Sequence, residues 1–343
     1  MTEPSSPFML ADDSVLAVRD LSVSFTQQGQ VTQAVRQLSL EVRRGETLAL
    51  VGESGSGKSV TSLALMRLIE QSGGRLESGE LWLRRRDNSV VDLARLRQSQ
   101  MRAIRGADMA MIFQEPMTAL NPTRRIGQLM TEVIRQHQRL SAREAQQKAI
   151  ALLTEMQIAD APQVMKRYPF ELSGGMRQRV MIALAFSCEP ELIIADEPTT
   201  ALDVTVQRQV LRLLKQKARA SNTAVLFISH DMAVVSQLCD RLYVMYAGAV
   251  IESGPTRQLI DRPAHPYSLG LLRCAPEASA PRAELPAIPG TVPNLTQPPV
   301  GCAFRERCFA ADARCLHTPS LSPCGADEQL AACWHPQLEQ RHV

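Results

Sequence analysis

Eight residues near the start of the chain, GESGSGKS at 52–59, have the types and spacing of a loop that holds phosphate groups. Glycines let such a loop turn tightly enough to point several N–H groups at phosphate oxygens. Lys58 can reach the outer phosphates of a nucleotide, and Ser59 can bind Mg²⁺. An apolar run at 47–51 precedes the loop, and a helix-like run at 59–69 follows it. This context favours nucleoside triphosphate binding over an ordinary glycine turn.

Two adjacent carboxylates end a second apolar run, LIIADE at 192–197. At the end of a buried strand, Asp196 can bind Mg²⁺ directly or through water. Glu197 can orient and polarise the water that attacks the terminal phosphate. An acidic pair can also simply begin a loop, but its occurrence together with the phosphate loop favours the catalytic interpretation.

A second glycine turn, LSGGMRQR at 172–179, comes just before a helix-like run. It offers Ser173 and the backbone N–H groups of Gly174 and Gly175 to an anion, but no lysine stands in the phosphate-loop position. The chain therefore carries two different anion-binding helix starts.

The elements that must position these residues are short apolar strands alternating with helices. Strands are predicted at 15–18, 21–25, 38–42, 47–51, 109–113, 192–196, 224–229 and 241–245. The almost continuous apolarity of the later strands is typical of a sheet covered on both faces. The helix predicted at 141–156 begins with a capping box, Ser141 with Glu144. The pattern predicts an α/β protein with a parallel core and an antiparallel β portion near the N-terminus.

Charge and hydropathy limit the possible partners and locations. The 38 basic and 35 acidic residues leave a net charge of +3, which gives no reason to expect a nucleic-acid partner. The first residues lack the features of a secretory signal. The longest uncharged apolar stretches, 180–188 and 242–251, reach only half of a membrane span, so a cytoplasmic location is expected.

The order of the motifs resembles that of ABC-transporter ATPase subunits: phosphate loop, Gln114, SGG turn, Asp196-Glu197, TALD at 200–203 and SHD at 229–231. The resemblance covers nearly the whole chain. It implies an ABC-type P-loop ATPase with a mixed sheet, an antiparallel β subdomain and a helical subdomain. It also implies a head-to-tail dimer in which each SGG turn completes the partner's site, with Asp203 in the dimer loop. Met176 replaces the glutamine that many members carry after SGG.

The same resemblance assigns roles to individual residues. Glu197, His230 and Lys58 are the implied catalytic residues, with His230 contacting the γ-phosphate. Mg²⁺ is held by Ser59, Gln114 and Asp196. Phe25 stacks on adenine, unless it is an ordinary strand residue. The implied ATP contacts are Phe25, Gly52, Glu53, Ser54, Gly55, Ser56, Gly57, Lys58, Ser59, Val60, Gln114, Ser173, Gly174 and Gly175.

Four longer segments narrow the resemblance to peptide-permease importers: 113–122, 167–183, 195–205 and 265–272. The family resemblance implies a second, non-identical ATPase subunit, two membrane permease subunits and, indirectly, a periplasmic or extracellular substrate-binding protein. It places the chain at the cytoplasmic face of the bacterial inner membrane, with the segment after Gln114 receiving a permease helix. The segments are most similar to D,D-dipeptide permeases. Glutathione or nickel remains an alternative cargo. A DNA-repair or chromosome ATPase is a further alternative, which the lack of a long heptad run disfavours.

The C-terminal part differs in composition from the rest. The predicted division is an N-terminal tail at 1–14, an ATPase domain at 15–260 and an extension at 261–343. Residues 275–300 carry seven of the 21 prolines and are expected to form an extended connector. The extension is expected to be a smaller unit appended to the ATPase and held against its core or its partner.

Five cysteines follow the connector with the spacing C-x5-C-x6-C-x8-C-x8-C. No C-x2-C pair is present, which makes a usual zinc knuckle a poor fit. Four thiolates around an iron–sulfur cluster or zinc would supply folding energy to such a tail. The family resemblance implies a [4Fe–4S] cluster on Cys302, Cys308, Cys315 and Cys333, with Cys324 as an extra. Zinc, or no metal, remains an alternative.

Overall fold

The computed structural model describes residues 10–115, 119–199, 202–274, 287–325 and 328–336. Several predicted features therefore lie wholly or partly outside the described residues. These are most of the tail at 1–14, residues 116–118 of the permease-facing segment, Thr200 and Ala201 of TALD, and 275–286 of the proline-rich connector.

A four-stranded antiparallel sheet in the order β2-β1-β4-β5 forms the N-terminal layer. Its strands are β1 (Ser14–Gln27), β2 (Gln30–Arg43), β4 (Gly74–Arg84) and β5 (Val90–Asp92). The two runs predicted at 15–18 and 21–25 form a single strand, β1. A shift in register between Val18 and Leu21 joins them, and Asp20 there adopts a φ of 48°. The irregularity explains why the sequence shows two apolar runs.

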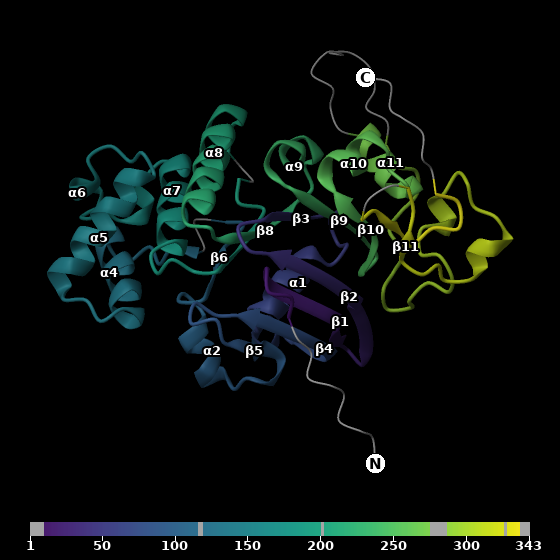
Figure 1. Cartoon of the computed structure of the whole chain (residues 1–343), viewed down its shortest axis with the longest axis horizontal. Coiled ribbons are helices and arrows are strands. Elements are labelled where there is room, and N and C mark those ends of the chain that lie inside the picture. The colour runs from purple at the N-terminus through teal and green to yellow at the C-terminus, as the bar shows by residue number, and fades with distance from the viewer. Residues whose placement is uncertain (1–9, 116–118, 200–201, 275–286, 326–327, 337–343) are drawn as a thin grey trace.

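A mixed sheet in the order β11-β12-β10-β9-β3-β8-β7-β6 forms the centre of the molecule (Figure 1). Its strands are β3 (Thr47–Val51), β6 (Met109–Ile112), β7 (Leu192–Asp196), β8 (Ala224–Ser229), β9 (Arg241–Tyr246), β10 (Ala249–Pro255), β11 (Ser322–Pro323) and β12 (Leu330–Ala331). The five strands from β9 to β6 pair in parallel. All residues of β7 and β8 are buried, as their continuous apolarity predicts.

Helices surround the mixed sheet and form an arm at one end of it (Figure 1). The helices are α1 (Lys58–Leu65), α2 (Gln98–Ile104), α4 (Ile126–His137), α5 (Ala142–Glu155), α6 (Ala161–Val164), α7 (Gly174–Ala185), α8 (Val204–Ala220), α9 (Met232–Leu238), α10 (Thr256–Asp261) and α11 (Pro266–Arg273). Short 3₁₀ turns lie at Ile69–Ser72, Leu93–Arg95, Pro169–Glu171, Arg305–Arg307 and Ala313–Leu316. Helix α1 contacts both sheets, and α4 to α7 form the arm. The observed architecture confirms the predicted fold class.

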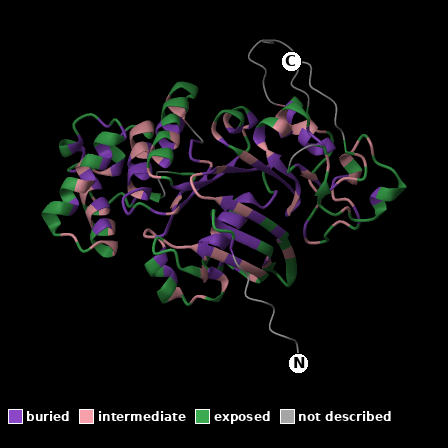
Figure 2. Cartoon of the chain, viewed as in Figure 1, coloured by how far each residue is buried: buried purple, intermediate pink, exposed green. Residues whose placement is uncertain are grey.

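Local sequence signals explain where individual helices begin. At the start of α5, the Ser141 hydroxyl accepts from the Glu144 N–H at 3.3 Å, and the Glu144 carboxylate accepts from the Ser141 N–H at 2.8 Å. This reciprocal pair confirms the predicted capping box. In Figure 2 the buried residues follow the strands, whereas the helices of the arm alternate buried and exposed faces.

The extension lies against the mixed sheet at the end opposite the arm (Figure 1). Its strand β12 pairs with β10, and its residues Leu295 and Phe304 belong to the larger buried core. The sequence predicted a smaller appended unit, and the described part of the extension shares both a sheet and a core with the preceding residues. The division at residue 260 stays a prediction. Within the described ranges, none of the helices combines the length and apolarity needed to cross a bilayer.

Candidate ATP-binding and hydrolysis site

The phosphate loop connects β3 to α1 and depends on glycine. Gly57 caps α1 with a φ of 104°, and a Cβ atom there would lie 2.5 Å from the Ala34 carbonyl oxygen. Gly55 has a φ of 80°. Both the left-handed backbone and the close packing exclude a larger residue at position 57. The loop thus places the N-terminus of α1 next to the carboxyl end of β3.

Lys58, the first residue of α1, turns its amine back onto the loop. Its Nζ atom donates to the carbonyl oxygens of Gly52 at 2.8 Å and Glu53 at 2.9 Å. Burial lowers the pKa of this amine, and the nearby carboxylates of Glu197, Asp196 and Glu53 oppose that shift. Phosphate oxygens would offer the amine stronger, charge-assisted partners at the same place.

Asp196, at the end of β7, faces the start of α1. Its carboxylate accepts from the hydroxyl of Ser59 at 3.2 Å and from that of Ser62 at 3.0 Å. Burial raises the pKa of Asp196, the two serine hydroxyls lower it, and the charge of Glu197 raises it further. A divalent cation beside Ser59 and Asp196 would reverse this balance, because it stabilises the ionised carboxylate. The hard oxygen donors fit Mg²⁺.

Glu197 follows directly and lies at the centre of a small hydrogen-bonded group. Its Oε2 atom accepts from the Gln114 amide at 3.1 Å, and its Oε1 atom lies 3.1 Å from Nδ1 of His230. Glu197 has a φ of 44°, an unusual backbone conformation for a non-glycine residue. Three segments that are distant in sequence therefore converge on one carboxylate, which is 15% exposed.

A cleft with a volume of about 960 Å³ lies between the phosphate loop and the Glu197 group, and Asp196 is not among its described lining residues. Its walls include residues 52–55 and 57–60 of the loop and helix start, together with Gln114, Glu197 and His230. Gly290, Thr291, Val292 and Arg307 of the extension also line it. The size is sufficient for a nucleotide.

Phe25 and the SGG turn are not among the described residues that line this cleft. The ring of Phe25 lies over Gly74 of β4, partly buried against the smaller core. The Ser173 hydroxyl caps α7 by accepting from the Met176 N–H at 3.4 Å. Gly175 packs against Val206 of α8, where a Cβ atom would be only 2.6 Å from a methyl carbon. The SGG turn is therefore not part of the cleft that the phosphate loop of the same chain lines.

Some residues of the site were missed in the sequence. Ser62 lies three residues after Ser59, and this helical spacing places both hydroxyls on one face of α1. The spacing could have revealed it. Arg307 and Tyr267, both of which contact Glu53, carry no local signal. They lie more than 200 residues beyond the loop.

The four predicted cluster cysteines share one environment. Burial raises the pKa of Cys333 to about 11, and the neighbouring thiols of Cys302, Cys308 and Cys315 add to the rise. All are free thiols, and the Cys302 N–H donates to the Cys315 carbonyl at 3.0 Å. Burial and the charge of Glu252 raise the pKa of Cys324 to about 11, and none of the four predicted cluster cysteines contributes to this shift. The thiol of Cys333 thus lies near those of the other three, whereas the ligand atoms that the described residues bring within 4.8 Å of one another belong to Asp312, Cys315 and His335.

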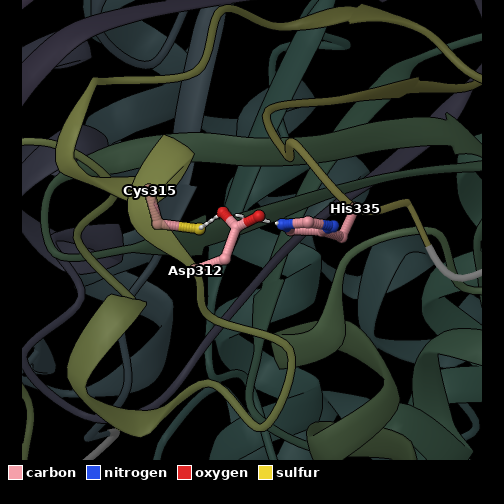
Figure 3. Close-up of side chains that lie close together, drawn as sticks. All are labelled: Asp312, Cys315 and His335. Atoms are coloured by element: carbon pink, nitrogen blue, oxygen red, sulfur yellow. Dashed lines mark hydrogen bonds and ion pairs between the residues drawn. The ribbon is translucent and has the colours of Figure 1, made fainter.

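A second set of possible metal ligands overlaps this one. Figure 3 shows Asp312 between Cys315 and His335. One carboxylate oxygen of Asp312 lies 3.0 Å from Nε2 of His335 and 3.8 Å from the Cys315 sulfur. A carboxylate, a thiol and an imidazole are ligand types that zinc accepts. Cys315 belongs to both sets.

Comparisons with known proteins define the class of the chain. The sequence profile of the family described as "ABC transporter" matches residues 35–200, and the one described as "Oligopeptide/dipeptide transporter, C-terminal region" matches residues 251–315. The dimeric structure of the bacterial ABC transporter cassette MJ0796 superposes with a TM-score of 0.61 at 24% identity, covering 71% of this chain and 99% of that one. This likeness supports the fold.

The chain belongs to the ATP-binding proteins of ABC transporters, within the peptide permease family. It is 64% identical to the "Probable D,D-dipeptide transport ATP-binding protein DdpD" of Escherichia coli K12, over 95% of this chain and 98% of that protein. It is 52% identical to the "Glutathione import ATP-binding protein GsiA" of Pectobacterium atrosepticum, over 87% of this chain. It spans about half of that longer relative, 47% of its length.

Membership identifies the chain as an ATPase coupled to transport, with ATP and Mg²⁺ as its cofactors. Membrane permease subunits and a substrate-binding protein are the implied partners. The DNA-repair and chromosome alternatives are thereby excluded.

Proposed function

We propose that the cleft binds ATP and Mg²⁺ through the residues predicted from the sequence, and that Glu197 orients the attacking water. The observation that carries this proposal is the position of Glu197 between Gln114 and His230, in the cleft that also holds Lys58. Lys58 and the loop N–H groups would bind the phosphates. Ser59 and Asp196 would hold Mg²⁺, with Gln114 beside them. His230 would contact the γ-phosphate.

The proposed working unit is a dimer with a second, non-identical ATPase subunit. The separation of the SGG turn from the chain's own cleft supports this proposal, because Ser173, Gly174 and Gly175 can then complete the partner's site. Phe25 would stack on the adenine base, and Asp203 would lie at the dimer contact. The dimer is tested by co-purifying the chain with the proteins that neighbouring genes encode and by measuring the mass of the complex. A complex with two copies of this chain and no second ATPase contradicts it.

The proposed cargo is a D,D-dipeptide, and the ATPase would drive its import across the inner membrane from a position at the cytoplasmic face. The 64% identity over nearly the full length of DdpD supports this choice. A strain lacking the related E. coli subunit provides the test, with uptake of radiolabelled D-alanyl-D-alanine as the readout. Restored uptake that disappears in Lys58→Ala supports the proposal, and failure with normal expression contradicts it.

Glutathione is the second candidate cargo, because relatives named for glutathione import are 52–53% identical to this chain. Uptake of glutathione and of an L,L-dipeptide should be measured in the same strains. Glutathione uptake without D,D-dipeptide uptake would reverse the order of the two candidates.

We further propose that Cys302, Cys308, Cys315 and Cys333 hold a [4Fe–4S] cluster that stabilises the extension. The support is that the thiols of Cys302, Cys308 and Cys315 all contribute to the raised pKa of Cys333, whereas none of them contributes to that of Cys324. Anaerobic purification with iron, sulfide and zinc assays tests this. Four irons and four sulfides per chain support the cluster. Zinc that depends on Asp312 and His335 points to the mixed ligand set of Figure 3 instead.

A further inference from the structure

Arg307 lies in the short turn between Cys302 and Cys308, and its side chain extends from this turn to contact the phosphate loop. Its Nη1 and Nη2 atoms lie 2.7 Å and 3.1 Å from the two carboxylate oxygens of Glu53. This is a two-pronged arginine–carboxylate pair, the geometry in which a guanidinium binds most strongly. The arginine side chain is only 5% exposed. Water therefore reaches the pair mainly from the side of Glu53, whose side chain is 29% exposed.

The surroundings hold Arg307 in this one orientation. Its Nε atom donates to the Pro289 carbonyl at 2.8 Å, and Nη2 donates to the Ile288 carbonyl at 3.2 Å. The guanidinium carbon lies 5.8 Å from the ring centres of both Tyr246 and Phe304. Hydrogen bonding to Glu53 raises the pKa of Arg307, so the side chain stays charged. The extension thus presents a fixed positive group to the loop.

Glu53 transmits this contact to the residues that hold phosphate. The Glu53 N–H donates to the Tyr267 hydroxyl at 2.8 Å, which fixes its backbone from the other side. The Glu53 carbonyl accepts from Nζ of Lys58 at 2.9 Å. One residue therefore has its side chain held by Arg307 and its carbonyl bonded to the lysine. A continuous path of two polar contacts joins the cysteine-rich turn to Lys58.

We infer that Arg307 is a positioning residue for ATP binding: its pair with Glu53 fixes the phosphate loop in the shape that accepts the nucleotide. The inference rests on the proposed function, because it takes the loop as the phosphate site. Gly290, Thr291 and Val292 support it, since they place the same extension along the wall of the cleft. The other possibility is that the pair only fastens the extension to the ATPase.

The test compares MgATP binding and turnover in full-length variants purified with their permease partners. Arg307→Ala is expected to weaken MgATP binding about tenfold, less than the loss of a buried charge pair that contacts a ligand directly, because Glu53 is 29% exposed and acts on the nucleotide through the loop. KM should rise in step, with kcat changed by less than about twofold, because the arginine does not touch the reacting atoms. Arg307→Lys should recover part of the affinity, since it keeps the charge but loses the two-pronged geometry.

The matched control is Arg305→Ala, two residues away in the same turn. Its side chain is 32% exposed and lies 4.0 Å from Glu306, not on the loop. It should leave MgATP affinity within about twofold of wild type, as for a surface substitution. An equal loss in Arg305→Ala and Arg307→Ala overturns the inference, because both would then act through general loosening of the turn.

Glu53→Gln weakens the same ion pair by a change in the phosphate loop and leaves the sequence of the extension unaltered. It therefore distinguishes an effect on the loop from an effect on the folding of the extension. The Glu53→Gln, Arg307→Ala double variant should bind MgATP no more weakly than the weaker single variant. Additive losses overturn the inference, as does wild-type affinity in Arg307→Ala. Lys58→Ala shows which proposal fails. If Lys58→Ala and Arg307→Ala both bind MgATP normally, the phosphate-loop assignment is wrong. If Lys58→Ala fails to bind MgATP while Arg307→Ala binds it normally, only the role of Arg307 is wrong.

Discussion

The phosphate loop and the cysteine-rich extension touch through Arg307 and Glu53, yet they are held in shape by different forces. The loop lies between β3 and α1, two regular elements that pack into large apolar cores. In the extension the two strands span two residues each, and apolar side chains such as Val300 and Phe309 are 81% and 68% exposed. The comparison teaches that the ATPase is built around large apolar cores, whereas the extension contributes residues such as Leu295 and Phe304 to a core that it shares with the ATPase.

The largest expected effect is confined to the first region. Glu197→Gln should reduce ATP hydrolysis about 1,000-fold, because an amide cannot polarise the attacking water as a carboxylate does. MgATP binding and the metal content of the extension should remain. Steady-state ATPase assays and equilibrium binding check this, with Glu155→Gln on the exposed end of α5 as the control. A normal rate in Glu197→Gln would remove Glu197 from the mechanism.

The contact between the two regions is expected to contribute strongly to stability. Phe304 of the extension is 3% exposed, and its ring centre lies 5.3 Å from that of Tyr246 and 5.4 Å from that of Tyr267. Phe304→Ala should lower the free energy of unfolding by about 3 kcal/mol, the loss typical of a buried aromatic ring. Denaturant titration measures it. Phe309→Ala, which removes an exposed ring, should change stability by less than about 0.5 kcal/mol. Equal effects would mean that Phe304 does not join the two regions.

A buried histidine next to this contact makes stability depend on pH. Burial lowers the pKa of His265 to about 3. The unfolded chain takes up this proton near pH 6.5, so stability should fall as the pH is lowered from about 6.5 towards 3, by at most about 1.4 kcal/mol per pH unit. In the native protein the Tyr267 N–H donates to Nδ1 of His265 at 3.0 Å. The variant His265→Asn keeps a side-chain acceptor for this N–H but cannot be protonated.

Comparing the two proteins removes the other pH-dependent contributions, including that of the neighbouring Glu252. Wild type should lose about 2 kcal/mol more than His265→Asn between pH 7 and pH 5. His317→Asn, at an exposed histidine of the extension, should behave as wild type. Parallel pH profiles for wild type and His265→Asn would refute the assignment.

The smallest expected effect concerns the extension alone. Cys308→Ser should remove one proposed metal ligand and make proteolysis of the extension about tenfold faster, because local opening becomes easier. The melting of the ATPase core should change little. Cys324→Ser, at the cysteine outside the proposed ligand set, should leave the cleavage rate unchanged. Equal cleavage of both variants would argue against a metal-bound extension.

The sequence predicted the elements that repeat a simple physical pattern. Three continuous apolar runs form strands with the bounds that the sequence predicts: 47–51, 192–196 and 224–229. The capping box predicted the start of α5. By contrast, β11 and β12 are too short to leave a periodic signal. The Glu53–Arg307 pair joins positions 254 residues apart, and no local pattern links them. Motif spacing found the groups expected to touch phosphate, but only the folded chain shows which residues support them.

The pairing of β12 with β10 has a consequence for chain association. Residues Glu252 and Ser253 of β10 pair with β9 on one side and with Ala331 and Leu330 of β12 on the other. Without β12, this outer strand would present unsatisfied N–H and C=O groups to solvent, a template on which another chain can add a strand. The extension therefore shields the end of the sheet from self-association, and a shortened chain lacking it would be prone to aggregate.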